Sequence, residues 1–411
     1  PFAEERKTMT LELASTPTAT LIESGVGCGK TAALIARVAA LLEDGATPEN
    51  MLVLAATPDA ARVLGARLTE AAGERGNAIE VTCARDVALG LLASEEGRAF
   101  SGRAGRLVTP LELGFIMEDM KTSGLKQRRL REMLKFFYRN WTELAGDAED
   151  DDGWLIPGEE ADVHALLKDV LHFTGGILEP EASAMAVRFL LARPDALADV
   201  QRSYVLVDDY QMHSRASQHL ANLLARDSIT VAADPTAVVE VFDSYPYGEG
   251  IDEFTQANEG CERIALNESH ACASAARAAS RLRASLDAGA APSDTETEDA
   301  SFTALEAADP VAEMAAVADA VQAALEAGTN PSSIYILAFH PAWERRIARA
   351  LEARDIAATL PIRGRVAAGD YRDLDRCAPA RLLTALALVA DPTDALAWRA
   401  WCGFGDYLAN S

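Results

Sequence analysis

A short loop rich in glycine carries the residue types that bind a phosphate. Residues 25–31 read Gly-Val-Gly-Cys-Gly-Lys-Thr, although Ser24 stands where the usual spacing has its first glycine. Glycines let the backbone curl so that successive N–H groups converge on an anion. In this spacing Lys30 would reach the β- and γ-phosphates of a nucleotide, and the Thr31 hydroxyl would bind Mg²⁺. The predicted phosphate-binding residues are Gly25, Gly27, Cys28, Gly29, Lys30 and Thr31.

Two elements must position this loop. The apolar run 19–23 predicts a strand before it, and apolar residues recurring on one face, among them Leu34, Val38 and Leu41, predict a helix after it. The amino end of that helix would add partial positive charge beside a phosphate. The alternative, a glycine-rich turn followed by an incidental Lys-Thr, leaves this strand–loop–helix context unexplained.

A second group of residues could act on the same phosphates. The apolar strand predicted over 204–208 ends in Asp208 and Asp209. Phosphoryl transfer needs a carboxylate that holds Mg²⁺ and a base that orients the attacking water. Asp208 fits the metal role and Asp209 the base role. The competing interpretation is a strand that ends in a polar turn.

The pattern along the chain indicates how these motifs are arranged. Strands and helices alternate over about 17–90, and strands return after residue 200, which favours a parallel α/β sheet. Residues 85–200 are mostly helical, with an acidic loop over 147–160, so we expect a helical insertion within the α/β domain. The strands expected in this sheet lie at 19–23, 51–57, 79–82, 204–208, 229–233 and 263–266. A second α/β unit is expected to begin after a linker near 290–301, with helices at 310–327 and 343–353 and strands at 333–339 and 356–360.

Composition bounds the class of protein. With 411 residues, 49% of them apolar and 25% charged, the chain is expected to form two to four globular units. No apolar run approaches the length of a membrane span, so no membrane partner is expected. The six cysteines lack metal-binding spacing, which favours reduced thiols and a bacterial-type cytoplasmic location.

The net charge of −25 would repel nucleic acid, so a DNA-binding surface would have to be local. One basic segment exists, and aromatic residues follow within it. Together these types could form a groove for a single strand, or they could be a solvated helix face whose aromatics pack inward. The residues are Lys121, Lys126, Arg128, Arg129, Arg131, Lys135 and Arg139, with Phe136, Phe137, Tyr138 and Trp141.

The order of these motifs resembles the UvrD/Rep/PcrA family of superfamily 1 DNA helicases. The phosphate loop is followed by Leu-Val-Leu-Ala-Ala-Thr at 52–57, then Val-Asp-Asp-Tyr-Gln at 207–211 and Ala-Ala-Asp-Pro at 232–235. The resemblance extends from about residue 15 onward and implies ATP and Mg²⁺ as cofactors. It adds Gln211 to the catalytic residues Lys30, Asp208 and Asp209, and it suggests DNA contacts by Thr57, Lys126, Arg128 and Arg129.

The resemblance also implies a domain plan. A RecA-like P-loop lobe would comprise 1–85 and 200–285, with a mainly helical subdomain inserted at 86–199. An acidic linker at 286–302 would lead into part of a second RecA-like lobe at 303–411. Because the family's last motifs are not found before Ser411, the plan favours an N-terminal portion of a longer protein.

Several positions depart from the family's pattern. The family's catalytic Glu is Asp209 here, one methylene shorter, and the Gln that senses the γ-phosphate falls on Ala237. A DNA-stacking aromatic falls on Glu240, and a transition-state arginine falls on Ala271. The family's N-terminal adenine-reading Gln has no clear counterpart.

Two functions follow as expectations. The first is an ATP-dependent helicase or translocase acting in DNA repair on single-stranded DNA or single/double-strand junctions. The second is a catalytically lapsed subunit that binds nucleotide, DNA or a nuclease partner. A kinase or GTPase shares only the phosphate loop, and the Asn-Lys-x-Asp string of GTPases is absent from the sequence. His213 and His219 are interpreted as ordinary histidines and not as metal ligands.

Overall fold

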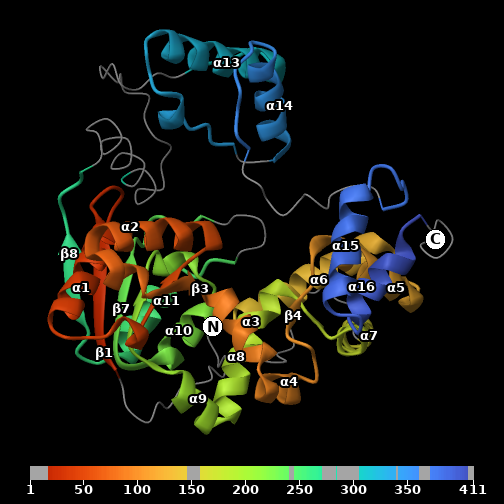
Figure 1. The fold of residues 1–411 in the computed structure, drawn as a ribbon, viewed down its shortest axis with the longest axis horizontal. Coiled ribbons are helices and arrows are strands. Elements are labelled where there is room, and N and C mark those ends of the chain that lie inside the picture. Colours follow the sequence, from red (N-terminus) through yellow and green to blue (C-terminus); the bar gives the residue numbers. More distant parts are fainter. Residues whose placement is uncertain are drawn as a thin grey trace, which may run out of the picture. The chain divides into compact units, whose positions relative to one another are not determined.

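The computed structural model describes residues 17–145, 158–239, 245–270, 284, 305–338, 341–360 and 371–405. The chain divides into two compact units (Figure 1). The first comprises Pro1–Ala284 and Gly369–Ser411, and the second comprises Ser285–Ala368.

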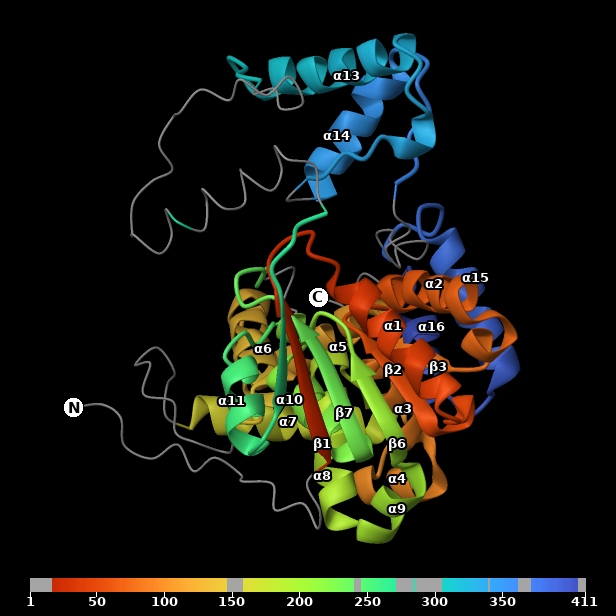
Figure 2. The ribbon, with the colours of Figure 1, turned by 90° about the vertical axis from the view of Figure 1, so that its left-hand side faces the viewer.

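The first unit is built on a six-stranded sheet in which every pairing is parallel. This confirms the predicted α/β class with a parallel sheet. Figure 2 shows β1, β7 and β6 side by side. In spatial order the strands are β3 (Glu80–Cys83), β2 (Met51–Ala55), β6 (Arg202–Val207), β7 (Ala225–Ala233), β1 (Thr18–Ser24) and β8 (Glu262–Leu266).

Helices cover both faces of the sheet because successive side chains of a strand point to opposite sides. On β1, Leu21 belongs to one buried cluster and Ile22 to the other. The Ile22 side is covered by α1 (Lys30–Glu43) and α2 (Pro58–Asn77). The Leu21 side is covered by α3 (Ala84–Ala93), α8 (Glu179–Ala192), α10 (Arg215–Leu224) and α11 (Gly250–Ala257).

The predicted helical insertion is present between β3 and β6. Its helices build a core of their own around Leu130, Phe137 and Leu167. Two two-residue strands, β4 (Arg106–Leu107) and β5 (Gly176–Ile177), pair within it, which the sequence pattern did not predict because such pieces are too short to show alternation. Besides α3 and α8, the helices are α4 (Glu95–Ser101), α5 (Pro110–Asp119), α6 (Gln127–Thr142), α7 (Glu159–Thr174) and α9 (Pro194–Val200).

Two C-terminal helices pack on this insertion. They are α15 (Ala378–Ala390) and α16 (Ala395–Gly403). Arg399 pairs with Asp119 of α5 at 2.6 Å, and Leu396 enters the core of the insertion. Residues 371–405 therefore belong to the first unit, although the domain plan expected them to continue a second lobe over 303–411.

The second unit contains α13 (Pro310–Glu326) and α14 (Pro341–Glu352), which confirms both predicted helices. They pack through Met314, Ala318, Ile347 and Leu351. In the part of this unit that the structure describes, 334–338 and 356–360 are not strands, so the strands predicted at 333–339 and 356–360 are wrong there. A strand is defined by a paired neighbour, and a sequence pattern alone supplies none. That this unit is part of a RecA-like lobe stays a prediction.

Short 3₁₀ turns complete the description: η1 (Pro48–Asn50), η2 (Met120–Ser123), η3 (Tyr210–Met212) and η4 (Pro331–Ser333). The expected linker at 286–302 lies outside the described residues. None of the helices within the described ranges is long and apolar enough to span a bilayer.

Candidate nucleotide-binding site

Three neighbouring strands of the sheet, β6, β7 and β1, deliver the candidate residues to one edge. The phosphate loop follows β1, the pair Asp208 and Asp209 follows β6, and Asp234 follows β7. In parallel sheets, ligands bind beyond the carboxyl ends of the strands, so this edge is the expected place for a site.

The loop adopts the conformation that its glycines permit. Gly27 and Gly29 have φ values of 72° and 84°, in the left-handed region that side chains disfavour. Gly29 precedes the first residue of α1, and its carbonyl accepts the Ala33 N–H at 2.9 Å. The predicted strand, loop and helix are therefore present, and the amino end of α1 opens directly from the loop.

Lys30 folds back over the loop instead of extending into solvent. Its Nζ donates to the Gly25 carbonyl oxygen at 3.2 Å and lies 3.5 Å from Asp234 Oδ2. The Lys30 side chain is 12% exposed and that of Asp234 is 1% exposed. Lys30 thus joins the first motif to the end of β7.

Thr31 and Asp208 meet as the predicted metal pair. The Thr31 hydroxyl donates to Asp208 Oδ2 at 2.9 Å and Oδ1 at 3.2 Å. Burial, and then the charge of Asp209, raises the pKa of the Asp208 carboxyl to about 6. Hydroxyl and carboxylate oxygens are the ligands that Mg²⁺ prefers, and it is commonly held by one or two protein groups together with substrate phosphates. The two side chains therefore fit Mg²⁺.

Asp209 and Gln211 lie on the turn after β6. Asp209 has φ 48° and ψ 52°, a left-handed conformation that Asp adopts more readily than most residues. Gln211 is buried; its Nε2 lies 3.5 Å from Asp209 Oδ1, and its Oε1 accepts the Asp234 backbone N–H at 3.0 Å. Gln211 therefore links the two carboxylate-bearing strand ends.

Both histidines near this turn are internal. His213 is buried, with its Nε2 3.1 Å from the Asp208 carbonyl oxygen, and burial lowers its pKa. Burial likewise lowers the pKa of His219. Their surroundings fit the interpretation as ordinary histidines.

Gln218 of α10, which the sequence reasoning missed, stabilises the turn after β6 by hydrogen bonds. Its Nε2 donates to the carbonyl oxygens of Tyr210, His213 and Tyr247, at 2.9, 3.3 and 2.8 Å. A Cβ added at Gly250 would lie 1.8 Å from Gln218 Oε1, so the glycine makes room for this amide. No periodicity in the sequence announces such a contact, since it joins residues from three segments.

The segment after β8 reaches the phosphate loop. The Ser269 hydroxyl donates to the Val26 carbonyl oxygen at 3.2 Å, and the His270 N–H donates to the Gly27 carbonyl oxygen at 2.9 Å. This is the segment compared with the family's Asn-Tyr-Arg-Ser string. Ala271, which occupies the arginine position of that string, lies outside the described residues, as does Glu240.

The predicted DNA-contact residues are spread over two elements. Thr57 caps α2, where its hydroxyl oxygen accepts the Ala60 N–H at 3.2 Å. On α6, Arg128 pairs with Glu132 at 3.1 Å, and Arg129 pairs with Glu159 at 2.9 Å, while Lys126 is exposed. Their role toward DNA stays a prediction.

The aromatics of α6 face inward. Phe136 and Phe137 are buried in the core of the insertion, and Tyr138 and Trp141 pack partly against it. Of the two interpretations left open, the structure favours the second, in which α6 has a solvated basic face and its aromatic residues pack inward. Phe136 and Phe137 are not placed to stack on bases.

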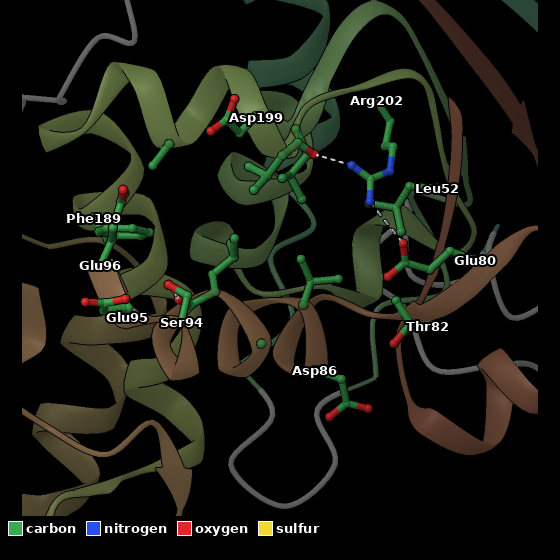
Figure 3. A pocket seen from close by; sticks show the side chains of 16 residues that line it. Leu52, Glu80, Thr82, Asp86, Ser94, Glu95, Glu96, Phe189, Asp199 and Arg202 are labelled. Atoms are coloured by element: carbon green, nitrogen blue, oxygen red, sulfur yellow. Dashed lines mark hydrogen bonds and ion pairs between the residues drawn. The ribbon is translucent and has the colours of Figure 1, made fainter. Parts of the chain in front are cut away.

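A separate cavity of about 610 Å³ lies at the opposite edge of the sheet, near the first residues of β2, β3 and β6 (Figure 3). Arg202 spans it to Glu80 at 3.4 Å. Five acidic side chains and a single Arg line it beside apolar residues, and this negative charge does not suit a nucleotide. The acidic residues are Glu80, Asp86, Glu95, Glu96 and Asp199.

Asp234 is the other functional candidate that the sequence reasoning left out of the site. The signal was present, because it ends a buried strand in the string Ala-Ala-Asp-Pro. A carboxylate at the end of a parallel strand next to the phosphate loop belongs among the candidates.

A comparison with protein families supports this site's assignment to a helicase family. The family model described as UvrD/REP helicase N-terminal domain matches residues 5–239, more than half of the chain. The curated proteins include no significant match.

Proposed function

The chain belongs to the UvrD/Rep helicase family, and on that premise we propose that it binds ATP with Mg²⁺ at the Lys30 site and uses it as a DNA helicase or translocase of superfamily 1. Its six-stranded parallel sheet is consistent with the RecA-like fold of that family. Helicases of this type generally use ATP and Mg²⁺ and act on DNA.

The observation that carries the proposal is the meeting of Thr31 with Asp208. These residues lie 177 positions apart, yet the hydroxyl and the carboxylate are in direct contact at 2.9 Å. Lys30 lies next to them on the same helix, with its ammonium over the loop. A glycine-rich turn that bound nothing would not require a buried carboxylate opposite its threonine.

Each group has a defined task in this site. Loop N–H groups and Lys30 would neutralise the phosphates, while Thr31 and Asp208 would hold Mg²⁺. When bound there, Mg²⁺ would neutralise negative charge on the phosphates. Asp209 would accept a hydrogen bond from the attacking water, and Gln211 keeps its carboxylate oriented toward the strand ends.

Single-stranded DNA or a single/double-strand junction is the proposed substrate. With a net charge of −25, the protein needs local basic groups for this, and the exposed residues Lys126, just before α6, and Arg131, on α6, are the best placed among those predicted. A role in DNA repair in the cytoplasm follows from the same family premise.

A second function is favoured by specific residues. Ala237 stands where the family has its γ-phosphate-sensing Gln, and a methyl group cannot donate a hydrogen bond. Asp209 is one methylene shorter than Glu. A subunit that binds nucleotide, DNA or a nuclease partner with little turnover would show these features.

The deciding experiment measures ATP hydrolysis by the full chain with and without single-stranded DNA, beside nucleotide binding by calorimetry. DNA-stimulated hydrolysis that is lost in Lys30→Ala but kept in Lys168→Ala, an exposed lysine on α7, supports the motor function. Nucleotide binding with no hydrolysis in either protein overturns the motor function and supports the lapsed subunit. No nucleotide binding at all overturns the motor function and the nucleotide site, and leaves only a lapsed subunit that binds DNA or a nuclease partner.

A further inference from the structure

Asp234 holds the central position of the site. It follows β7, and β7 lies between β6, which ends in Asp208, and β1, which leads into the phosphate loop. Its side chain is 1% exposed. A buried carboxylate is costly unless it is paired or well hydrogen-bonded, so its partners show what it does.

The two oxygens of Asp234 have different partners. Oδ1 accepts the Thr236 backbone N–H at 2.9 Å and the Thr236 hydroxyl at 2.6 Å, within its own turn. Oδ2 lies 3.5 Å from Lys30 Nζ. The turn therefore fixes the carboxylate, and its second oxygen meets the ammonium of the phosphate loop.

Lys30 carries one positive charge, and two anions need it. In the structure, Asp234 provides the counter-charge, while the Gly25 carbonyl accepts a further bond from the ammonium. A β- or γ-phosphate would need the same ammonium. Since an ion pair shielded from water is stronger than an exposed one, giving up Asp234 carries a cost.

We propose that Asp234 is a built-in competitor for Lys30, which holds the ammonium in the nucleotide-free protein and yields it to the β- and γ-phosphates. The proposal rests on the proposed function, because it requires a nucleotide at this site. It makes Asp234 a positioning residue that sets nucleotide affinity without touching the reacting atoms.

Asp234 is also linked, through Gln211, to the turn that bears Asp209. The Asp234 N–H donates to Gln211 Oε1 at 3.0 Å, and Gln211 Nε2 lies 3.5 Å from Asp209 Oδ1. Replacing Asp234 by Asn leaves that backbone bond and the Oδ1 acceptor in place. The substitution therefore removes the charge while keeping the turn.

The test compares binding of ATP, ADP and AMP to the full chain by calorimetry. In Asp234→Asn, ATP and ADP are expected to bind roughly three- to tenfold more tightly, because no carboxylate competes for Lys30. AMP lacks the phosphates that Lys30 reaches, so its affinity is expected to stay unchanged. The matched control is Asp227→Asn, which removes one charge from the other end of the same strand.

A double-mutant cycle assigns the effect to the pair. In a Lys30→Ala background, Asp234→Asn is expected to give no tightening. If wild type binds ATP and Asp234→Asn binds it with equal or weaker affinity, the inference is overturned and the proposed function stays intact. Absence of binding by both wild type and Asp234→Asn overturns the proposed function and the inference together. If Asp227→Asn increases ATP affinity as much as Asp234→Asn does, the effect is one of net charge alone, and the inference is also overturned.

Discussion

The Thr31 hydroxyl donates hydrogen bonds to both carboxylate oxygens of Asp208, at 2.9 and 3.2 Å. The two oxygen groups of the candidate Mg²⁺ site are thus assembled by the fold itself. The carboxylate is buried beside Asp209, and the Thr31 hydroxyl, the Asp209 backbone N–H and the charge of Lys30 do not fully offset the lost hydration. The ionised Asp208 carboxylate is therefore an unfavourable buried charge.

Stability is expected to depend on pH through Asp208. Burial raises its pKa from 3.8 to about 6, so its contribution to stability is fully present below about pH 3.8 and is lost as the pH rises through about 6. Asp208→Asn removes the charge and keeps an acceptor for Thr31. At pH 7.5 it should stabilise the metal-free protein by at most about 3 kcal/mol, since one pKa unit corresponds to about 1.4 kcal/mol.

Denaturant unfolding of wild type and Asp208→Asn between pH 5 and 7.5 checks this. The gain should shrink toward pH 5, where wild type takes up its proton. A gain that is the same at every pH would show that the carboxyl is not the titrating group.

Asp209→Glu probes the turn after β6. Glu restores the methylene that the family has at this position, so we expect faster ATP hydrolysis than in wild type. The left-handed backbone, φ 48°, suits Asp better than Glu, and the variant should lose about 0.5–1 kcal/mol of stability. Asp209→Asn keeps the backbone preference and loses the base, so its hydrolysis should be abolished. Hydrolysis by Asp209→Glu no faster than by Asp209→Asn would exclude position 209 as the base.

Gln218→Leu tests the support beneath this turn. Three carbonyl groups lose a donor, and the expected destabilisation is about 2 kcal/mol. Gln256→Leu, an exposed glutamine on α11, should cost under about 0.5 kcal/mol. Both are measured by urea denaturation of the full chain. Equal losses in the two variants would mean that the amide does not hold the turn.

Strand ends were predicted well because the sheet is buried on both faces. Runs such as Val-Leu-Val before Asp208 are continuous and apolar, and glycines mark the loop before Lys30. The phosphate loop and the Thr31–Asp208 pair follow from these local signals together with the known rule that parallel strands end at one edge. That part of the site could be predicted from the sequence.

What depends on partners far along the chain could not be predicted. Asp234 is a strand-end carboxylate like Asp208, but its pairing with Lys30 follows from β7 lying between β6 and β1, which sequence order does not reveal. Gln218 looks like any polar residue of an amphipathic helix. Residues 334–338 form a continuous apolar run like a buried strand, yet Leu337 is 94% exposed and no strand forms there within the described part of the chain.

The aromatic residues of α6 give a further prediction. Phe137 is buried and its ring lies 4.9 Å from that of His164, so Phe137→Ala should cost about 3–5 kcal/mol of stability.

Lys126→Ala combined with Arg131→Ala changes only exposed groups, and each substitution should change stability by no more than about 0.5 kcal/mol. The double substitution should instead weaken the binding of single-stranded DNA and reduce the salt dependence of that binding. Fluorescence anisotropy at several salt concentrations, beside thermal unfolding, separates the two effects. Unchanged DNA affinity in the double variant would show that these two side chains do not contact the DNA phosphate backbone.

The long insertion between β3 and β6 has a consequence for biosynthesis. Thr31 must wait for Asp208, 177 residues later, before its contact can form, and β1 pairs only with β7 and β8. At about 5–20 residues per second, β1 leaves the ribosome roughly 10–40 s before its partner β7 begins to be made. During that interval, β1 lacks both of its strand partners and β2 lacks β6, and unpaired strand edges are prone to aggregation.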